Sequence, residues 1–497
     1  MLNLNIGRKK VKIVATLGPA SADKSVIKNI IKNGADVLRL NFSHGNEDLF
    51  AEVINNIRSI SGAVGILIDL PGPKIRTGKL TKNSVAIARG SKIVLTDRNV
   101  VSDAKRIFIN YPYLGKDIKP GSLVYIDDGK IKLRVIKKLN KNELEAEVLT
   151  NGILDPEKGI NFPGSVLSIP SVTDNDKRFL KFGAEHNVDM FAVSFVRSPD
   201  DISSVKNFLK DGYPKKKFLI IAKIEKIEAV KNIEKIAMVA DALMVARGDL
   251  GVEAPVENIP IEQKRIISVA NFYKKPVITA TQMLLSMVEN ESPTRAEVTD
   301  ISNAIFDGTD SVMLSEETAV GKYPASAVKY MSKIIKATEK SAIFNKIYKS
   351  GYNGKYLSGY HNLDTFKTQT PDISNIIAEM SVEASKLLKS SIIAAITRSG
   401  YTANLISSLK PHVPIIAIVP NESVKRKLSL SFGVSCIVME NIEDKDIDLK
   451  DVIDLINGGL KNAGRKSPDY AILTGSVPIG EPGSTDFVKI VRLKDNK

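Results

Sequence analysis

The stretch at residues 218–226, FLIIAKIEK, combines an apolar run with a lysine and a carboxylate at its end. Because successive side chains of a strand point to opposite faces, Lys223 and Glu225 would emerge together at a strand end. A second apolar run, ADALMVARGDLG at residues 240–251, again ends in charged residues that include Asp249. Carboxylates from neighbouring strand ends are ligands that a hard divalent ion such as Mg²⁺ prefers. The pattern predicts a metal site at Glu225 and Asp249, whereas KIEK alone would more often be a solvated, salt-bridged helix face.

Length and charge limit the classes of protein that this sequence can encode. At 497 residues the chain should hold two to four domains, given roughly 150 residues per domain. Lysine and arginine number 71 against 56 acidic residues, so the formal net charge is +15. The basic residues are spread along the chain and are not interleaved with aromatic residues, which argues against nucleic acid. Basic pockets for small phosphorylated ligands explain the surplus better.

Targeting signals and cysteine chemistry are absent from the sequence. No apolar run approaches the roughly 18 residues of a membrane span, and the N-terminus lacks the apolar core of a signal peptide. The only cysteine, Cys436, excludes an internal disulfide bond, and the scatter of the four histidines argues against a zinc centre. We therefore expect a cytoplasmic protein that binds neither membrane nor nucleic acid.

Short apolar runs alternate with helical patterns between residues 11 and 320. Eight such units indicate a closed (β/α)₈ TIM barrel, whose active site lies at the carboxyl ends of its strands. The runs are KIVATLGPAS, ADVLRLNFSHG, VGILIDLPGPK, VDMFAVSFVRS, FLIIAKIEK, ALMVARGDLG, PVITATQML and SVMLSEETA. Two connecting helices have clear signals: one ends at Gly34, and another begins after Ser292 with Pro293 at its first position and ends at Gly308.

Two segments depart from this alternation and predict further domains. Residues 74–170 contain strand-like runs separated by turn signals, which indicates a small β-barrel domain inserted after the third barrel strand. Such an insertion is either a decoration or a lid that closes over the barrel mouth. Residues 341–497 begin a fresh alternation that is typical of an open, mostly parallel α/β domain. The barrel domain would then comprise residues 1–73 and 171–340.

Seven ordered motifs make the chain resemble the pyruvate kinase family over nearly its full length. They are RLNFSHG (39–45), GPKIRTG (72–78), KIEK (223–226), MVARGDLGVE (244–253), ATQML (280–284), PTRAE (293–297) and MLSEETA (313–319). The resemblance implies transfer of the phosphoryl group of phosphoenolpyruvate to ADP, giving pyruvate and ATP, the last step of glycolysis.

The resemblance assigns roles at the predicted metal site. Glu225 and Asp249 match the ligands of Mg²⁺, which Mn²⁺ could replace. Lys223 matches the residue that stabilises charge on the transferring phosphoryl group, and Arg39 matches a phosphate-binding arginine. Phosphoryl transfer needs positioning and positive charge around the oxygens, which these side chains supply.

The same resemblance places the substrate carboxylate. The ARGDLG turn directs the backbone N–H groups of Gly248 and Asp249 towards an anion at a helix start. Thr281 matches a threonine beside the substrate, where a hydroxyl orients the carboxylate and a water chain that protonates the enolate. A buried strand end is the alternative interpretation of ATQML.

Nucleotide-binding residues are expected on the barrel and on the lid. Arg76 and, from the lid, Lys158 match positions that contact the ADP phosphates, with Asn41 and His44 nearby. The two aspartates at 127–128 suit either a second, nucleotide-bound Mg²⁺ or a plain turn.

One departure from the family pattern concerns a monovalent cation. Members that require K⁺ hold it with residues matching Asn41, Ser43, Asp69 and the carbonyl of Leu70, and they carry Glu where this chain has Lys74. An ammonium group there would supply the positive charge of the ion, and two cations at close range would repel each other. We therefore expect activity without added K⁺.

A further anion site is suggested in the C-terminal domain. The TRSGYTA segment at 397–403 follows a strand and opens a helix, so the hydroxyls of Thr397, Ser399 and Thr402 with the N–H groups around Gly400 could cradle a phosphate. Relatives use this loop for an activating phosphorylated metabolite, although a plain βα turn fits as well. In the family, the far side of a sugar-bisphosphate pocket can include a tryptophan, and this chain has none, which argues against a sugar bisphosphate as effector. The resemblance also implies a homotetramer.

Two alternative functions differ in what they require. Another Mg²⁺-dependent barrel enzyme acting on phosphoenolpyruvate or pyruvate, a lyase or a mutase, shares the paired carboxylates but has no use for the lid, Lys223 and GPKIRTG together. A basic nucleic-acid-binding protein would show steep salt dependence and no ATP formation.

Overall fold

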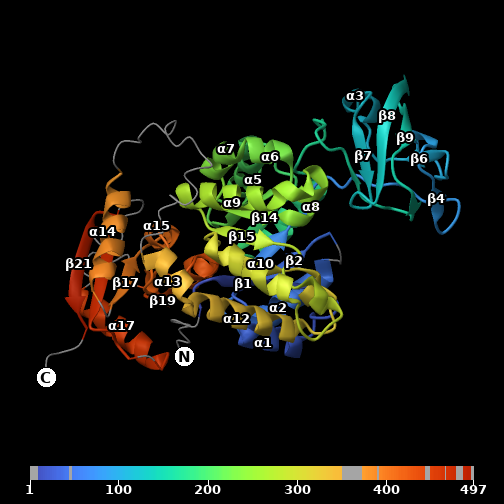
Figure 1. Ribbon diagram of the computed structural model, residues 1–497. Coiled ribbons are helices and arrows are strands. Elements are labelled where there is room, and N and C mark those ends of the chain that lie inside the picture. Colours follow the sequence, from blue (N-terminus) through green and yellow to red (C-terminus); the bar gives the residue numbers. More distant parts are fainter. Residues whose placement is uncertain are drawn as a thin grey trace.

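A computed structural model provides the structure of the protein. It describes residues 9–43, 47–349, 372–388, 391–440, 442, 448–464, 466–476 and 485–493. Figure 1 shows three regions, with a barrel surrounded by helices between an inserted β domain and a C-terminal α/β domain.

Eight parallel strands close the central barrel, which confirms the predicted (β/α)₈ fold. In barrel order they are β1 (Lys12–Leu17), β16 (Ser311–Leu314), β15 (Val277–Ala280), β14 (Ala242–Ala246), β13 (Leu219–Ile224), β12 (Met190–Val193), β3 (Gly65–Asp69) and β2 (Val37–Asn41). Almost every strand residue is buried, because one face packs inside the barrel and the other packs against the helices. This double burial explains why the strands are nearly continuous apolar runs.

The surrounding helices return the chain to the start of each strand. They are α1 (Lys24–Asn33), α2 (Glu47–Ile60), α4 (Asp174–Glu185), α5 (Pro199–Gly212), α6 (Ile227–Lys231), α7 (Ile233–Val239), α8 (Arg247–Glu253), α9 (Ile259–Phe272), α10 (Arg295–Phe306), α11 (Glu316–Ala319), α12 (Pro324–Lys340) and α13 (Ala342–Lys349). Among the described residues, no helix combines the length and apolarity that crossing a membrane requires.

The sequence predicted the end of α1 correctly but placed the start of α10 too early. Helix α1 ends at Gly34, whose φ of 116° is accessible to glycine at little cost. Helix α10 begins two residues later than predicted, because Thr294 is its N-cap and Pro293 precedes it. The Thr294 hydroxyl accepts a hydrogen bond from the backbone N–H of Glu297, and the Glu297 carboxylate accepts one from the N–H of Thr294. This capping box fixes the start of the helix more strongly than the proline does.

The inserted domain is a curled β half-barrel that stands apart from the barrel in Figure 1. Its six-stranded sheet runs in the order β11-β7-β8-β9-β5-β6, and β10 pairs with β4 in a separate sheet. The strands are β4 (Val85–Ile87), β5 (Lys92–Thr96), β6 (Arg106–Phe108), β7 (Leu123–Ile126), β8 (Ile131–Asn140), β9 (Glu143–Val148), β10 (Gly152–Leu154) and β11 (Ile160–Asn161), with helix α3 (Leu114–Asp117). The predicted limits of the insertion fall in the connections that flank these strands.

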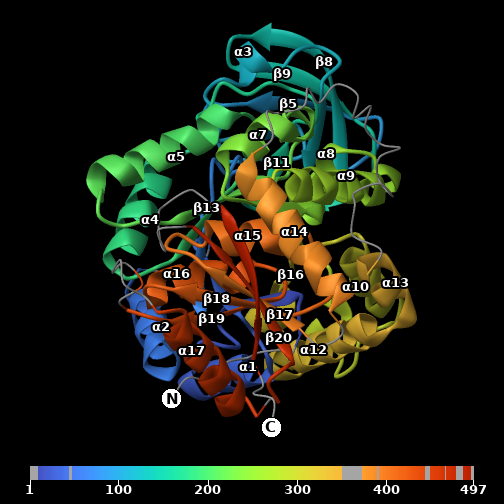
Figure 2. The same ribbon diagram turned by 90° about the vertical axis from the view of Figure 1, so that its left-hand side faces the viewer.

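The C-terminal domain is the predicted open α/β sheet, and it lies towards the viewer in Figure 2. Strand order is β19-β18-β17-β20-β21, and only β21 runs antiparallel to its neighbour. The elements are α14 (Ile373–Leu387), β17 (Ser391–Ile396), α15 (Tyr401–Ser408), β18 (Ile415–Val419), α16 (Glu422–Lys427), β19 (Val434–Val438), α17 (Leu449–Asn462), β20 (Tyr470–Gly475) and β21 (Phe487–Arg492).

Buried polar contacts join this domain to the barrel. The Lys410 side chain is fully buried, and its Nζ lies 2.6 Å from Oδ1 of Asp310, just before β16. Asp310 Oδ1 also accepts the backbone N–H of Phe432 at 3.1 Å. Lys12 of β1 donates to the carbonyl of Val434 at 2.6 Å. The contacts fasten the C-terminal domain to the face of the barrel at which the strands begin.

Replacement of Lys410 by methionine should lower the stability of the whole chain. Removing one partner of a buried ion pair leaves an uncompensated charge on Asp310, which typically costs about 3–5 kcal/mol. We expect a clear decrease in the midpoint of thermal unfolding, measured by circular dichroism. The exposed Lys450 is a matched control, and Lys450→Met should leave the midpoint nearly unchanged. The double variant Lys410→Met/Asp310→Asn should recover part of the loss, and equal midpoints for all four proteins would refute the role of the pair.

Candidate active site

The carboxyl ends of the barrel strands bring the predicted catalytic residues together. Arg39 lies on β2, Asp69 ends β3 and Lys223 lies near the end of β13. Glu225 directly follows β13, and Asp249 lies in the first turn of α8, directly after β14. Residues that are up to 210 positions apart in the sequence thus share one site because parallel strands end at the same rim.

The Lys223 ammonium group is held by three oxygen atoms. Its Nζ lies 2.7 Å from Oε1 of Glu225, 3.1 Å from Oδ1 of Asp69 and 2.7 Å from Oγ of Ser194. Burial disfavours the charged form, but the carboxylates of Asp69 and Glu225 outweigh it and raise the pKa of Lys223 above its usual value. The residue is therefore a fixed, fully protonated cation.

Arg39 and Asp69 form a second buried pair beside Lys223. Arg39 Nε donates to Oδ2 of Asp69 at 2.7 Å, and its guanidinium group also donates to Oγ1 of Thr16 at 2.9 Å. Asp69, a predicted ligand for K⁺, thus has each carboxylate oxygen next to a cationic side chain. Asn41 pairs with Asp69 in the strand register, and its Oδ1 accepts the backbone N–H of Ser43 at 3.2 Å. These two are the other described side chains of the predicted monovalent-cation pocket.

Glu225 and Asp249 are buried carboxyl groups whose charged forms are disfavoured. Burial raises the pKa of Glu225 to about 7, and the charge of Asp249 adds to this effect. Burial also raises the pKa of Asp249, and the charges of Asp128 and Asp69 act in the same direction. Among the described residues, no group of three or more His, Cys, Asp or Glu side chains could hold a metal ion. Two carboxylates suit Mg²⁺, which keeps several waters and takes further oxygens from a substrate.

A strained turn presents Thr281 at the end of β15. Thr281 and Gln282 have φ values of 68° and 56°, a region that residues other than glycine rarely occupy. The Thr281 hydroxyl accepts the backbone N–H of Gly248 at 2.9 Å, so this N–H is engaged within the protein. Arg247 supports the turn by donating to the Thr281 carbonyl at 2.6 Å while it pairs with Asp300 at 2.8 Å. Strain kept by such supports is characteristic of functional sites.

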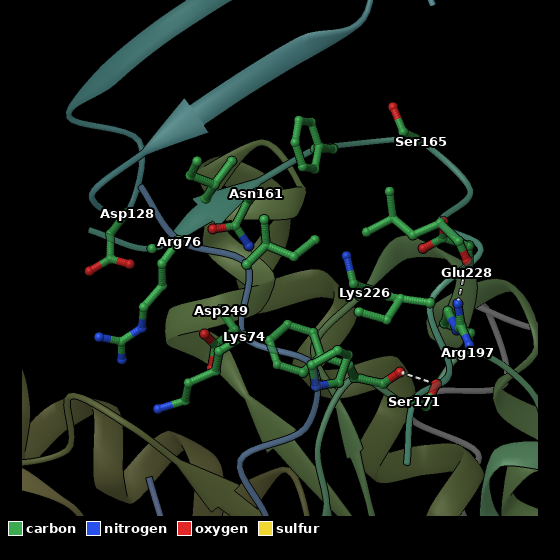
Figure 3. A pocket seen from close by; sticks show the side chains of 18 residues that line it. Lys74, Arg76, Asp128, Asn161, Ser165, Ser171, Arg197, Lys226, Glu228 and Asp249 are labelled. Atoms are coloured by element: carbon green, nitrogen blue, oxygen red, sulfur yellow. Dashed lines mark hydrogen bonds between the residues drawn. The ribbon is translucent and has the colours of Figure 1, made fainter. Parts of the chain in front are cut away.

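A small cavity lies between the inserted domain and the barrel mouth. Its volume is about 160 Å³, and residues of both domains line it. Figure 3 shows Asp128 of the inserted domain on the same side of the cavity as Arg76, Lys74 and Asp249. Lys158 lies next to the Asp128 turn, with its Nζ 3.4 Å from Oδ1 of Asp127. The inserted domain therefore faces Asp249, one of the two predicted metal ligands.

Lys74 interacts electrostatically with the charged side chains at the strand ends. Burial lowers the pKa of Lys74 to about 8, helped by the positive charges of Arg76 and Lys223 and opposed by Asp69 and Asp249. At neutral pH the side chain still carries most of its charge. A cation thus stands beside the predicted K⁺ pocket.

A larger cavity of about 640 Å³ opens beside Arg39 on the other side of the mouth. Apolar side chains, including Pro19, Leu49 and Phe50, line much of it, and Asn41 supplies a polar group. Such a cavity suits a planar apolar group with a few polar atoms. His44, also predicted to contact nucleotide, lies outside the described residues.

Several residues of the site were not identified from the sequence. Ser194, which binds Lys223, follows β12, and its position at a strand end was the available signal. The backbone N–H of Phe195 donates to Oε2 of Glu225 at 2.9 Å. Lys226 and Glu253 form a buried pair at 2.9 Å, which the motif KIEK did not reveal.

The predicted phosphate cradle in the C-terminal domain has its hydroxyl groups engaged. Thr397 Oγ1 accepts the backbone N–H of Gly400 at 3.0 Å, and Ser399 Oγ accepts that of Tyr401 at 3.4 Å. Thr402 Oγ1 lies 2.8 Å from Oγ1 of Thr485, and both hydroxyls are buried. In this conformation the loop has the hydrogen bonds of a plain βα turn.

Comparison with protein-family models finds the pyruvate kinase barrel domain at residues 8–328 and the pyruvate kinase alpha/beta domain at residues 375–491. The chain is 41% identical over 492 residues to a pyruvate kinase of Thermococcus litoralis, covering 97% of this chain and 98% of that protein. It is 38% identical over 494 residues to one of Thermotoga maritima, covering 98% of this chain and 100% of that protein.

A solved structure supports the same assignment. The fold is similar to the crystal structure of a pyruvate kinase from Cryptosporidium parvum, with a TM-score of 0.88 and 31% identity over 98% of this chain and 97% of that one. The two family models together span most of the sequence and include every strand end that forms the site. The chain therefore belongs to the pyruvate kinase family.

Proposed function

We propose that the chain uses the barrel mouth to transfer the phosphoryl group of phosphoenolpyruvate to ADP, giving pyruvate and ATP. The roles of the residues are assigned from one observation: the Lys223 ammonium group lies between the carboxylates of Asp69 and Glu225. This fixed cation provides positive charge for a phosphoryl group, and the Glu225 and Asp249 carboxylates beside it suit a divalent metal ion.

Lys223 and Arg39 would bind the transferring phosphoryl group. The negative charge of that group spreads over its equatorial oxygens during transfer, so prepositioned cations stabilise the transition state without reorganisation. Asp69 holds both cations in place. The planar guanidinium group of Arg39 can bind two oxygens at once.

Glu225 and Asp249 would hold Mg²⁺, or Mn²⁺ in its place. When bound there, the ion neutralises charge on the phosphoryl and carboxylate oxygens of the substrate. Burial raises the pKa values of both carboxyl groups, and a bound cation would favour their charged forms.

Thr281 and Gly248 would orient the substrate carboxylate. In this structure the Gly248 N–H donates to the Thr281 hydroxyl, so an incoming carboxylate would take over one or both of these donors. The same hydroxyl could hold a water molecule that delivers the proton to the enolate. Asp249 would contribute its backbone N–H at the start of α8.

ADP would bind between the barrel and the inserted domain. The apolar cavity beside Asn41 suits a nucleobase and ribose, whereas Arg76 and Lys158 suit the phosphates. Closure of the inserted domain would bring Lys158 nearer and exclude water, which favours transfer to ADP over hydrolysis.

We further propose that Lys74 makes K⁺ dispensable. Both carboxylate oxygens of Asp69 are already next to cationic groups, and Lys74 adds a third positive charge nearby. The family resemblance also suggests a homotetramer, a cytoplasmic location and a phosphorylated effector at the 397–402 loop, and these remain predictions.

Replacement of Lys223 by methionine should abolish transfer while phosphoenolpyruvate still binds. Loss of a transition-state donor commonly lowers kcat by about 10²–10³-fold, and loss of a full charge should reach at least this range. Pyruvate release can be measured in a coupled assay, and calorimetry can measure substrate binding. Lys231→Met, at an exposed position on α6, is the matched control. Unaltered turnover in Lys223→Met would refute the role of this lysine, and thermal unfolding would reveal any loss of folding.

Replacement of either metal-binding carboxylate should weaken binding of Mn²⁺. We expect Glu225→Gln and Asp249→Asn each to raise the dissociation constant for Mn²⁺ at least about tenfold, measured by electron paramagnetic resonance with phosphoenolpyruvate present. Asp128→Asn removes a nearby carboxylate that is not assigned to the metal and should have a much smaller effect. Mn²⁺ binding that is insensitive to the first two changes would contradict the assignment.

The unaltered enzyme should be active in a K⁺-free buffer of tetramethylammonium salts. Lys74→Glu should create a K⁺ requirement, because it replaces a positive charge near the pocket with a negative one that attracts the ion. Lys79→Glu, a matched change in the same connection, should leave turnover without K⁺ unchanged. An unaltered enzyme that is inactive until K⁺ is added would overturn the proposal.

A further inference from the structure

The turn that follows β12 contacts both parts of the catalytic cluster. Ser194 Oγ accepts a hydrogen bond from Nζ of Lys223 at 2.7 Å. The backbone N–H of the next residue, Phe195, donates to Oε2 of Glu225 at 2.9 Å. Two consecutive residues thus hold the fixed cation and one of the proposed metal ligands. A displacement of this turn would move both of those side chains.

Phe195 has a backbone conformation that an aromatic residue rarely adopts. Its φ is 55°, in the left-handed region that favours glycine. The ring is only partly buried, and it lines the cavity between the inserted domain and the barrel. Packing in the core of either domain therefore does not explain the conformation. Contacts of the surrounding backbone and side chains must impose it, as is typical of functional sites.

Both connections of the inserted domain contact Phe195. Gly72 lies in the first connection, and a Cβ atom at this position would lie 2.7 Å from Cδ2 of the Phe195 ring, so the ring packs directly on the Gly72 backbone. Ser171, in the second connection, is buried and donates its hydroxyl to the Phe195 carbonyl at 3.1 Å (Figure 3). The inserted domain stands on these two connections, so its movement changes the contacts of Phe195.

A third series of contacts reaches the ring from the inserted domain itself. Lys226 Nζ lies 5.8 Å from the centroid of the Phe195 ring, within the range of a cation–π contact. The same Nζ lies 2.9 Å from Oε1 of Glu253, and both side chains are buried. Asn161 of β11 donates to this Glu253 oxygen at 3.5 Å. The position of β11 is thus transmitted to the ring as well.

We propose that Phe195 is a positioning residue that couples the position of the inserted domain to the metal ligand Glu225. The two connections hold the strained turn, and the turn holds the carboxylate. Such coupling is reciprocal: an arrangement of the inserted domain that favours metal binding is itself favoured by the bound metal. This inference rests on the proposed role of Glu225 as a metal ligand, and Phe195 acts only through that side chain.

The first test measures Mn²⁺ binding by electron paramagnetic resonance with phosphoenolpyruvate present. Ser171→Ala leaves both metal ligands intact but frees the Phe195 carbonyl, and it should raise the dissociation constant about two- to tenfold, as expected for a lost neutral hydrogen bond. Phe195→Gly releases the backbone that donates to Glu225 and should raise the constant at least about tenfold. Phe195→Tyr keeps the ring and should keep the affinity.

Ser407→Ala is the matched control for Ser171→Ala. Ser407 is also buried, and its hydroxyl donates to the carbonyl of Phe432 at 2.8 Å in the C-terminal domain. Loss of this hydroxyl should leave the dissociation constant for Mn²⁺ unchanged. Thermal unfolding shows whether each variant is folded, and Ser171→Ala carries the test if Phe195→Gly does not fold.

The second test measures the distance between the domains by double electron–electron resonance. Spin labels are attached at the exposed positions of Lys138→Cys on β8 and Lys235→Cys on α7, in a Cys436→Ala background. Saturating Mg²⁺ with phosphoenolpyruvate should shift the distance distribution in the otherwise unaltered protein and in Phe195→Tyr, but not in Phe195→Gly. A merely structural role of Phe195 would weaken metal binding and leave this shift intact.

Equal shifts in Phe195→Gly and the unaltered protein would overturn the coupling, as would an unaltered protein whose distances do not respond to Mg²⁺. Equal Mn²⁺ affinities of Ser171→Ala and Ser407→Ala would also contradict it. Failure of the proposed function gives a different result, because Glu225→Gln would then leave Mn²⁺ binding unchanged. If Glu225→Gln weakens Mn²⁺ binding and the changes at Phe195 and Ser171 do not, only the coupling is wrong.

Discussion

The buried ammonium group of Lys223 is the interaction on which the catalytic site depends. A charge removed from water costs several kcal/mol unless partners compensate it, and here Asp69, Glu225 and Ser194 surround it. Asp69 also holds Arg39, so one carboxylate positions both cations of the site. These partners come from strands β2, β3, β12 and β13, which a closed barrel aligns at one rim. The charge can be buried only because the barrel is closed.

The mouth of the barrel also holds a turn with an unfavourable backbone conformation. Arg247 spans from the Asp300 carboxylate to the Thr281 carbonyl and so keeps this turn in place. The inserted domain stands on two connections and places Asp128 at the same cavity as Asp249. This arrangement fits the proposed function, in which the strand ends fix the substrate and closure of the inserted domain covers the nucleotide.

The junction between the barrel and the C-terminal domain depends on a second buried charge. Lys410 of the C-terminal domain is fully buried, and its partner Asp310 directly precedes a barrel strand. Each charge is therefore compensated only while the two domains are in contact.

The sequence by itself determined the order of elements and the types of residue at each strand end. All eight barrel strands were recognised, because burial on both faces requires continuous apolar runs. Lys223, Glu225 and Asp249 were singled out because they are charged residues at the ends of such runs. The start of α10 and the partner Ser194 were not found. Only the tertiary structure decided these features, since contacts between residues far apart in sequence depend on closure of the barrel and on packing of the domains.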